Sequence, residues 1–153
     1  MSRTRAWILI VVAIVAIGIQ FVPVERSNPA VDPALEVEAP VAWLLRHACF
    51  DCHSQQTVWP WYSRVAPASW LVAHDVSEAR HVLNFSVWQQ YPARKKSFLA
   101  AATVEEIEKG AMPPPQYRWI HRDARVSPEA REWLSAWADS LSAADTSPAP
   151  PRR

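Results

Sequence analysis

The stretch Cys49-Phe50-Asp51-Cys52-His53 contains both cysteines of this 153-residue chain, three positions apart, with a histidine directly after the second. This CxxCH spacing is the attachment pattern of a c-type haem. Each thiol can add across one vinyl group of a porphyrin to form a thioether, and the imidazole then lies under the iron. Positions i and i+3 of a helix share a face, so both sulfurs meet one edge of the macrocycle. We therefore predict one covalently attached haem c, held by Cys49 and Cys52, with His53 as the proximal iron ligand.

Two other uses of the cysteine pair stay open at this stage. A thiol–disulfide oxidoreductase would use Cys49 and Cys52 as its redox pair, but the chain lacks the expected βαβ pattern and His53 would have no role. A zinc site would need two histidines beside the cysteines, and no second ligand pair shows finger-like spacing. Both alternatives explain less of the motif than haem attachment does.

The composition favours an all-α domain. Two glycines are too few for a hairpin-rich β protein, a Rossmann turn or a P-loop. Fourteen prolines predict short helices joined by stiff, extended loops, and nine tryptophans are available to surround an apolar group. The formal net charge of +1 gives no indication of nucleic-acid binding.

An apolar segment precedes the motif. Residues 6–22 read AWILIVVAIVAIGIQFV without a charge, which is at the short end of the range for a membrane-spanning helix. Arg3 and Arg5 come before it, so residues 1–5 are expected in the cytoplasm and the rest outside. A cleaved signal peptide is the alternative, although the small residues of Ala16-Ile17-Gly18 lie inside the apolar run. We predict an uncleaved, single-pass anchor in a bacterial inner membrane, with the soluble part in the periplasm.

Residues 23–40 are predicted to be a tether, and residues 41–142 the haem-binding domain. The tether is polar and proline-rich, which makes a semi-rigid spacer. Its prolines are Pro23, Pro29, Pro33 and Pro40. Pro40 suits the first turn of a helix that leads into the motif. The side chains of this helix expected to face the core or the porphyrin are Trp43, Leu44 and Ala48.

The middle of the domain contains a second predicted helix, which Pro67 starts and which runs from Ala68 to about Val82. The aromatic loop Trp59-Pro60-Trp61-Tyr62 precedes it and fits either a wrapping around a flat apolar group or a local aromatic cluster. Ser86 is expected to cap a short turn around Trp88. The basic run at residues 94–96 is expected to be solvated.

Signals for helix ends continue toward the C-terminus. Thr103 and Glu106 form a predicted capping box, and Gly110 suits the left-handed position that ends the same helix. Residues 111–117 are expected to be extended because of their three consecutive prolines. Ser127 caps and Pro128 opens a last helix, in which Trp133, Trp137 and Leu141 recur every fourth residue. Residues 143–153 are predicted to be a disordered tail.

Met112 is the predicted distal iron ligand. Apart from Met1 it is the only methionine, and it lies on a loop stiffened by prolines. A rigid loop favours a weak thioether ligand because less entropy is lost on binding. Methionine opposite histidine also raises the reduction potential, as electron-transfer cytochromes require. The competing histidines are His74, His121, His81 and His47, of which His74 lies on an otherwise apolar stripe.

Several blocks together resemble the bacterial haem-binding domain family of small, exported, cytochrome c-like proteins. The blocks are Ala48 to Ser54, Val58 to Ser63, Ala66-Pro67, Ser69-Trp70, Asp75-Val76, Leu83 to Ser86 and Gly110 to Pro114. The resemblance covers roughly residues 28–140. It implies a compact helical fold with covalent haem, often behind one membrane anchor, with Cys49, Cys52 and His53 at the haem and Met112 in the MP loop. Ala79 stands where the family pattern has a glycine before Arg80.

The residues favour a single-electron carrier, with the tryptophans shielding the ring and raising its potential. Haem and an unidentified redox protein are the expected partners. The alternative is a haem-based sensor or a peroxidase-like enzyme with an open distal site, for which His74 and Asp75 are the only suggestive pair. A catalytic activity beyond electron transfer has no basis in these residues.

Overall fold

The computed structural model describes residues 2–30 and 35–146. Within these ranges the chain consists of helices and loops, with no strand, which confirms the all-α prediction. The α-helices are α1 (Arg3–Gly18), α2 (Ala39–Ala48), α3 (Phe50–His53), α4 (Ala68–Val82), α5 (Ala93–Glu108), α6 (Pro115–Ile120) and α7 (Pro128–Thr146). Four 3₁₀ helices lie between them: η1 (Ile19–Phe21), η2 (Trp61–Arg64), η3 (Phe85–Gln90) and η4 (Arg122–Ala124).

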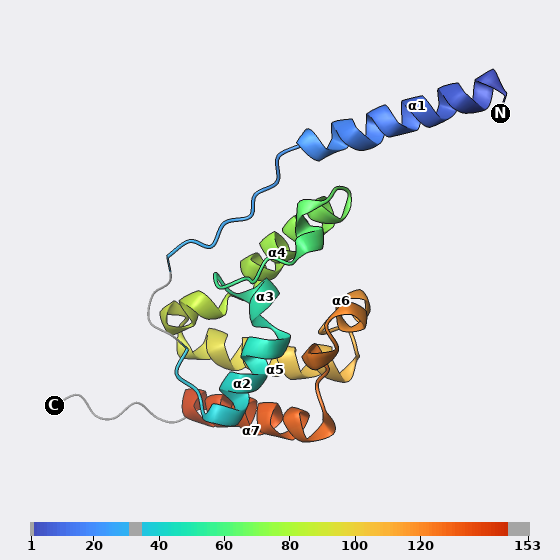
Figure 1. The fold of residues 1–153 in the computed structure, drawn as a ribbon. Helices are drawn as coiled ribbons and strands as arrows, with labels where there is room; N and C mark the ends of the chain where they lie inside the picture. The colour runs from blue at the N-terminus through green and yellow to red at the C-terminus, as the bar shows by residue number, and fades with distance from the viewer. Residues whose placement is uncertain (1, 31–34, 147–153) are drawn as a thin grey trace.

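The domain is built on the pair α5 and α7, which lie side by side and pack against each other most extensively (Figure 1). Helix α2 packs on α7, and α3 continues from α2 to pack against α4. The core between them is apolar, and Leu45, Phe85 and Leu134 are almost completely buried. Helix α1 projects from this domain as a separate rod (Figure 1).

A row of aromatic rings connects the CxxCH motif to α7. Phe50 stacks on Phe85 with ring centroids 5.5 Å apart, and Phe85 contacts Trp88 at 5.7 Å. Trp88 in turn contacts Trp137 of α7 at 5.4 Å. Aromatic pairs at such distances stabilise beyond the area that they bury. The predicted α7 stripe is confirmed, since its large side chains pack against the core.

Several helix ends lie where local signals predicted them. Ser127 caps α7, because its Oγ accepts a hydrogen bond from the backbone N–H of Ala130 at 3.1 Å. Gly110 follows α5 with a φ of 71°, a conformation that glycine adopts without steric cost. Pro40 stands in the first turn of α2, and α4 has the predicted bounds.

The predicted capping box at Thr103 is wrong. Helix α5 begins ten residues earlier at Ala93, directly after Pro92, so Thr103 and Glu106 lie inside it. The Thr103 hydroxyl donates instead to the carbonyl oxygen of Leu99 at 2.8 Å, one turn back. A threonine followed three residues later by glutamate also occurs within helices, where the hydroxyl has this other partner.

Four other local predictions are also corrected. Asn84 caps η3 in place of Ser86, because its Oδ1 accepts from the Ser86 N–H at 2.9 Å. Residues 115–117 form the first turn of α6, since proline is compatible with that position. Trp43 is 54% exposed, on the outer face of α2. Helix α7 extends to Thr146, so the predicted disordered tail is helical over 143–146, while 147–153 and Pro33 lie outside the described residues.

The N-terminal helix has no buried residue. Together α1 and η1 form one apolar helix of 19 residues, Arg3–Phe21, with a mean hydropathy of 2.1. By length and composition it could cross a membrane, and a signal sequence fits the same observation equally well.

Candidate haem site

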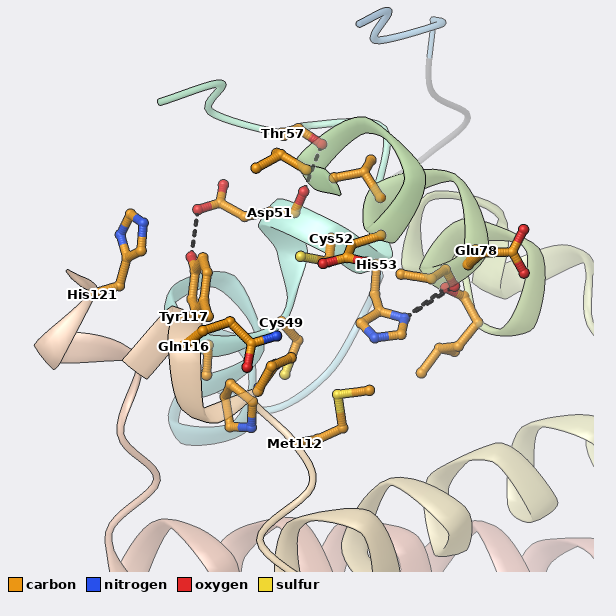
Figure 2. A pocket seen from close by; sticks show the side chains of 18 of the residues that line it. Cys49, Asp51, Cys52, His53, Thr57, Glu78, Met112, Gln116, Tyr117 and His121 are labelled. Atoms are coloured by element: carbon orange, nitrogen blue, oxygen red, sulfur yellow. Dashed lines mark hydrogen bonds between the residues drawn. The ribbon is translucent and has the colours of Figure 1, made fainter. Parts of the chain in front are cut away.

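A large cavity, here called the main pocket, opens between α3, α4, the C-terminal half of α5 and the loop that leads into α6. Its volume of about 590 Å³ falls within the range of cofactor sites, roughly 300–1,000 Å³. The lining is mainly aliphatic and includes Val58, Leu71, Val72, Val76, Val82, Leu83, Leu99, Ile107 and Ile120. The polar and sulfur-bearing side chains at its centre are shown in Figure 2.

The CxxCH motif forms one tight turn at the pocket wall. Helix α2 ends at Ala48, and the backbone N–H groups of Cys52 and His53 donate to the carbonyl oxygen of Cys49 at 3.1 and 2.8 Å. This turn places Cys49, Cys52 and His53 on the same wall, and all three line the main pocket. The two cysteines, which are three positions apart, therefore both face the pocket.

The imidazole of His53 is held in one tautomer. Its Nδ1 lies 3.1 Å from the carbonyl oxygen of Ala79 and 3.0 Å from that of Leu83, both at the C-terminal end of α4. Carbonyl oxygens only accept, so Nδ1 carries the proton and Nε2 keeps its lone pair for a metal. Burial lowers the pKa of His53, against the opposing effect of these two hydrogen bonds. A neutral imidazole with a free Nε2 is the form that ligates iron.

The two thiols are held in their protonated form. Burial, with Cys52 nearby, raises the pKa of Cys49 to about 12. Burial raises the pKa of Cys52 to about 11, with Asp51 and Asp75 contributing. A thiol–disulfide oxidoreductase needs the opposite shift, because a lowered pKa supplies the attacking thiolate. The raised pKa values of the two thiols therefore disfavour the oxidoreductase alternative.

Met112 lies on the loop after α5, across the main pocket from the motif. The loop is pinned to the helix end, since the N–H groups of Ala111 and Met112 both donate to the carbonyl oxygen of Glu106, at 2.9 and 3.1 Å. Arg118 of α6 donates to the carbonyl oxygen of Gly110 at 3.1 Å. The Met112 side chain is 38% exposed and lines the pocket. Figure 2 shows its thioether and the His53 imidazole approaching the same space from separate elements.

The competing histidines are placed less favourably. His47 and His81 are not part of the pocket lining, and His47 stacks on Trp43 at the surface. His121 lines the pocket, but its Nε2 is hydrogen-bonded to the Tyr62 hydroxyl at 2.7 Å. His74 also lines it, from α4, the same helix whose carbonyl groups hold His53. Met112 is thus the soft donor that faces the motif from another element.

A model of the haem-binding domain family matches residues 14–140, which is most of the chain. The chain belongs to the haem-binding domain family. No curated protein and no solved structure shows significant similarity to it. The assignment agrees with the geometry, because a large aliphatic cavity with imidazole and thioether donors on facing walls suits a haem better than a lone metal ion. In the described part of the chain, no cluster of three histidine, cysteine or acidic side chains is arranged to hold a metal, so the zinc alternative has no support.

Serine side chains hold the loop that follows the motif in this haem-binding domain. Ser54 is fully buried, and its Oγ donates to the carbonyl oxygen of Phe50 at 2.7 Å and accepts from the Gln56 N–H at 3.0 Å. The Ser86 Oγ accepts from the Gln55 N–H at 2.8 Å. Buried polar groups cost stability unless they are paired in this way. These hydrogen bonds give Ser54 and Ser86, which belong to two of the family-like blocks, a structural role beside the CxxCH motif.

A polar network beside the motif was not visible in the sequence. The Tyr117 hydroxyl donates to Oδ2 of Asp51 at 2.8 Å, and the Tyr117 ring stacks on His121 with centroids 4.2 Å apart. Burial raises the pKa of Tyr117, and the bond to Asp51 adds to this, so the hydroxyl stays protonated as a donor. Asp51 also accepts from the Val58 N–H at 3.0 Å. Since 66 positions separate Tyr117 from Asp51, no local signal could have paired them.

The predicted tryptophan enclosure is wrong. No tryptophan lines the main pocket, whose aromatic members are Tyr62, Phe85 and Tyr117 together with histidines. Trp88, Trp133 and Trp137 instead fill the core on the α7 side. In the aromatic loop, Pro60 and Tyr62 line the pocket, whereas Trp61 is largely exposed. Aliphatic side chains therefore supply most of the apolar surroundings.

Proposed function

We propose that this haem-binding domain is a membrane-anchored monohaem c-type cytochrome that transfers single electrons. Cys49 and Cys52 would hold one haem c as thioethers, and His53 and Met112 would ligate its iron. The observation that carries the proposal is the His53 tautomer, which leaves Nε2 free on the pocket wall that bears both thiols. Histidine ligands in metalloproteins are oriented by this kind of second hydrogen bond.

When bound, haem supplies a one-electron iron couple. The chain's own residues tune it in three ways. The carbonyl groups of Ala79 and Leu83 fix the plane of the His53 imidazole and increase its basicity. The Met112 thioether would favour the ferrous state and so raise the reduction potential. The aliphatic lining excludes water, which disfavours the more highly charged ferric state.

The anchor and the compartment belong to the same proposal. The apolar helix Arg3–Phe21 would remain uncleaved in a bacterial inner membrane, with Arg3 and Arg5 on the cytoplasmic side. The domain would then lie in the periplasm and exchange electrons with a redox protein. Attachment of c-type haem outside the cytoplasm agrees with this orientation.

A haem-based sensor or peroxidase-like enzyme is the second candidate. The partial exposure of Met112 favours it, because a thioether on a surface loop is open to displacement. His74 and Asp75 both line the pocket and would be the acid–base pair. Carbon monoxide separates the two candidates. Rapid binding by the ferrous wild-type protein favours a sensor or enzyme, whereas an electron carrier with Met112 in place binds it poorly.

The test of covalent attachment uses the full chain, expressed with a c-type maturation system and purified from membranes. We expect haem to stay with the polypeptide through acid–acetone extraction and on a denaturing gel stained for haem. The Cys49→Ala/Cys52→Ala variant is the matched control and should lose the haem in both assays. Complete extraction of haem from the wild-type chain would refute the c-type assignment.

A further inference from the structure

Five exposed apolar side chains lie on η2, α4 and α6 or directly beside them, and each of these elements also contributes residues to the lining of the main pocket. This rim patch consists of Trp61, Val65, Leu71, Trp119 and Ile120, with exposed fractions from 47% to 77%. Leu71 and Ile120 both line the pocket, from α4 and α6. The hydrogen bond between the Tyr62 hydroxyl and His121 holds the two halves of the patch together. An exposed aromatic and aliphatic patch of this kind marks an interaction surface.

The end of the apolar N-terminal helix is tied to the loop that carries this patch. Gln20 lies in the last turn of that helix. Its Nε2 donates to the carbonyl oxygen of Ala66 at 3.2 Å, and its Oε1 accepts from the Ala66 N–H at 2.9 Å. Val65 of the rim patch directly precedes Ala66 in the chain. The point at which the helix ends is therefore adjacent to the patch.

The segment after the helix is bound along the same loop. Arg26 donates to the carbonyl oxygen of Ser63 at 3.0 Å. Arg80 donates to the carbonyl oxygen of Ser27 and to Oδ1 of Asn28, both at 2.9 Å. The same guanidinium also donates to the carbonyl oxygen of Ser54 at 2.8 Å, beside the CxxCH motif. These hydrogen bonds link residues 20–28 to the loop that carries Val65 and to Arg80 of α4.

The chemistry of the patch matches a lipid surface. Tryptophan is enriched at membrane interfaces, where its ring enters the headgroup layer and its N–H stays hydrated. Trp61 and Trp119 have this exposure. The exposed guanidinium groups of Arg64 and Arg122 flank them in sequence and would meet anionic headgroups. In Figure 1, α6 lies on the side of the domain toward which α1 extends.

We propose that the rim patch docks onto the surface of the membrane in which α1 is anchored, so that the mouth of the main pocket faces the lipid headgroups. The inference rests on the proposed membrane anchor. It distinguishes the rim patch from Trp43 and Phe98, which are as exposed but lie on α2 and α5, away from the tied loop. Haem in this orientation would exchange electrons with a partner at the membrane surface.

The experiment uses the haem-loaded full chain in liposomes that contain a phosphatidylcholine with a photoreactive headgroup. After irradiation, lipid adducts are mapped by peptide mass spectrometry. We expect adducts on peptides covering 61–71 and 119–120 in addition to α1, and none on Trp43 or Phe98. Adducts confined to α1 would overturn the docking inference and leave the anchor intact. Removal of the chain by alkaline carbonate, in contrast, would overturn the anchor together with the docking.

Paired variants separate docking from folding. Trp61→Ser/Trp119→Ser should lose the lipid adducts on 61–71 while haem content and the reduced absorbance spectrum stay at wild-type levels. The matched control, Trp43→Ser/Phe98→Ser, removes the same kind of exposed surface and should leave the adducts unchanged. Equal loss in both variants would contradict the assignment of the rim patch. Gln20→Ala removes the tie at Ala66 and is expected to spread the adducts over other surfaces.

Discussion

The two walls of the main pocket position their proposed iron ligands in different ways. His53 lies on a turn packed against α4, and two carbonyl oxygens hold its imidazole. The side chain of Met112 is partly exposed on a loop, and the hydrogen bonds that place it belong to the backbone. On the motif wall the hydrogen bonds thus fix the side chain itself, whereas on the Met112 wall they fix only the backbone. Removing the first ligand should therefore disturb haem binding far more than removing the second.

The largest effect is expected for His53→Ala. This change removes the proximal donor and also leaves the carbonyl groups of Ala79 and Leu83 without their shared partner. We expect the yield of haem-loaded chain to fall roughly tenfold or more, because outer contacts alone change metal affinity 10–100-fold. Haem-to-protein ratio measures the loss. His47→Ala, at an exposed histidine outside the pocket, is the control and should match the wild type. A normal low-spin spectrum in His53→Ala would contradict the proximal assignment.

A smaller effect is expected for Met112→Ala. The haem stays attached through both thioethers, but the ferrous protein should bind carbon monoxide, and the reduction potential should fall by about 100 mV or more. Absorbance spectroscopy and a redox titration measure these two changes. Met112→His should restore a six-coordinate spectrum at a lower potential than the wild type. Unchanged ligation in Met112→Ala would transfer the distal role to His74, the other candidate in the pocket.

The smallest effect concerns how the stability of the haem-free chain depends on pH. We expect this dependence to come from the thiols and the imidazole of the CxxCH motif. Unfolded thiols ionise near pH 9, while the pKa values of folded Cys49 and Cys52 are about 12 and 11. From pH 9 to 11 the folded state therefore keeps protons that the unfolded state loses, and stability falls as pH rises. His53 affects stability at the acid end of the pH range. Its lowered pKa means that the unfolded imidazole takes up a proton first, so stability also falls as pH drops below about 6.5.

Thermal unfolding of the haem-free full chain across this pH range measures how the melting temperature changes with pH on the alkaline and on the acid side. Cys49→Ala/Cys52→Ala should lose much of the alkaline slope and keep the acid one. An identical alkaline slope in that variant would show that the thiols are not the titrating groups. In the haem-loaded protein the thiols would be thioethers, so the alkaline contribution of these two groups should vanish.

Predictions from short-range patterns were confirmed where the signal and its partner lie within one turn. The Ser127 cap, the positive φ of Gly110 and the bounds of α4 depend on contacts a few residues apart. Thr103 shows the limit of such signals. The capping-box pattern was present, but Pro92 had already started the helix, and the hydroxyl found a carbonyl oxygen one turn back. A local pattern is ambiguous when two local partners satisfy the same donor.

The sequence by itself determined the CxxCH motif, the all-α class and the apolar N-terminal helix, because each depends on residue types at fixed, short spacing. Only the tertiary structure decided which groups surround the motif. Arg80 joins Ser27 to the motif loop across 53 positions, and Tyr117 reaches Asp51 across 66. The nine tryptophans show the same division. Their number suggested that they enclose an apolar group. Whether a given tryptophan is buried in the core or exposed at the rim depends on how the helices pack, and composition contains no information about this packing.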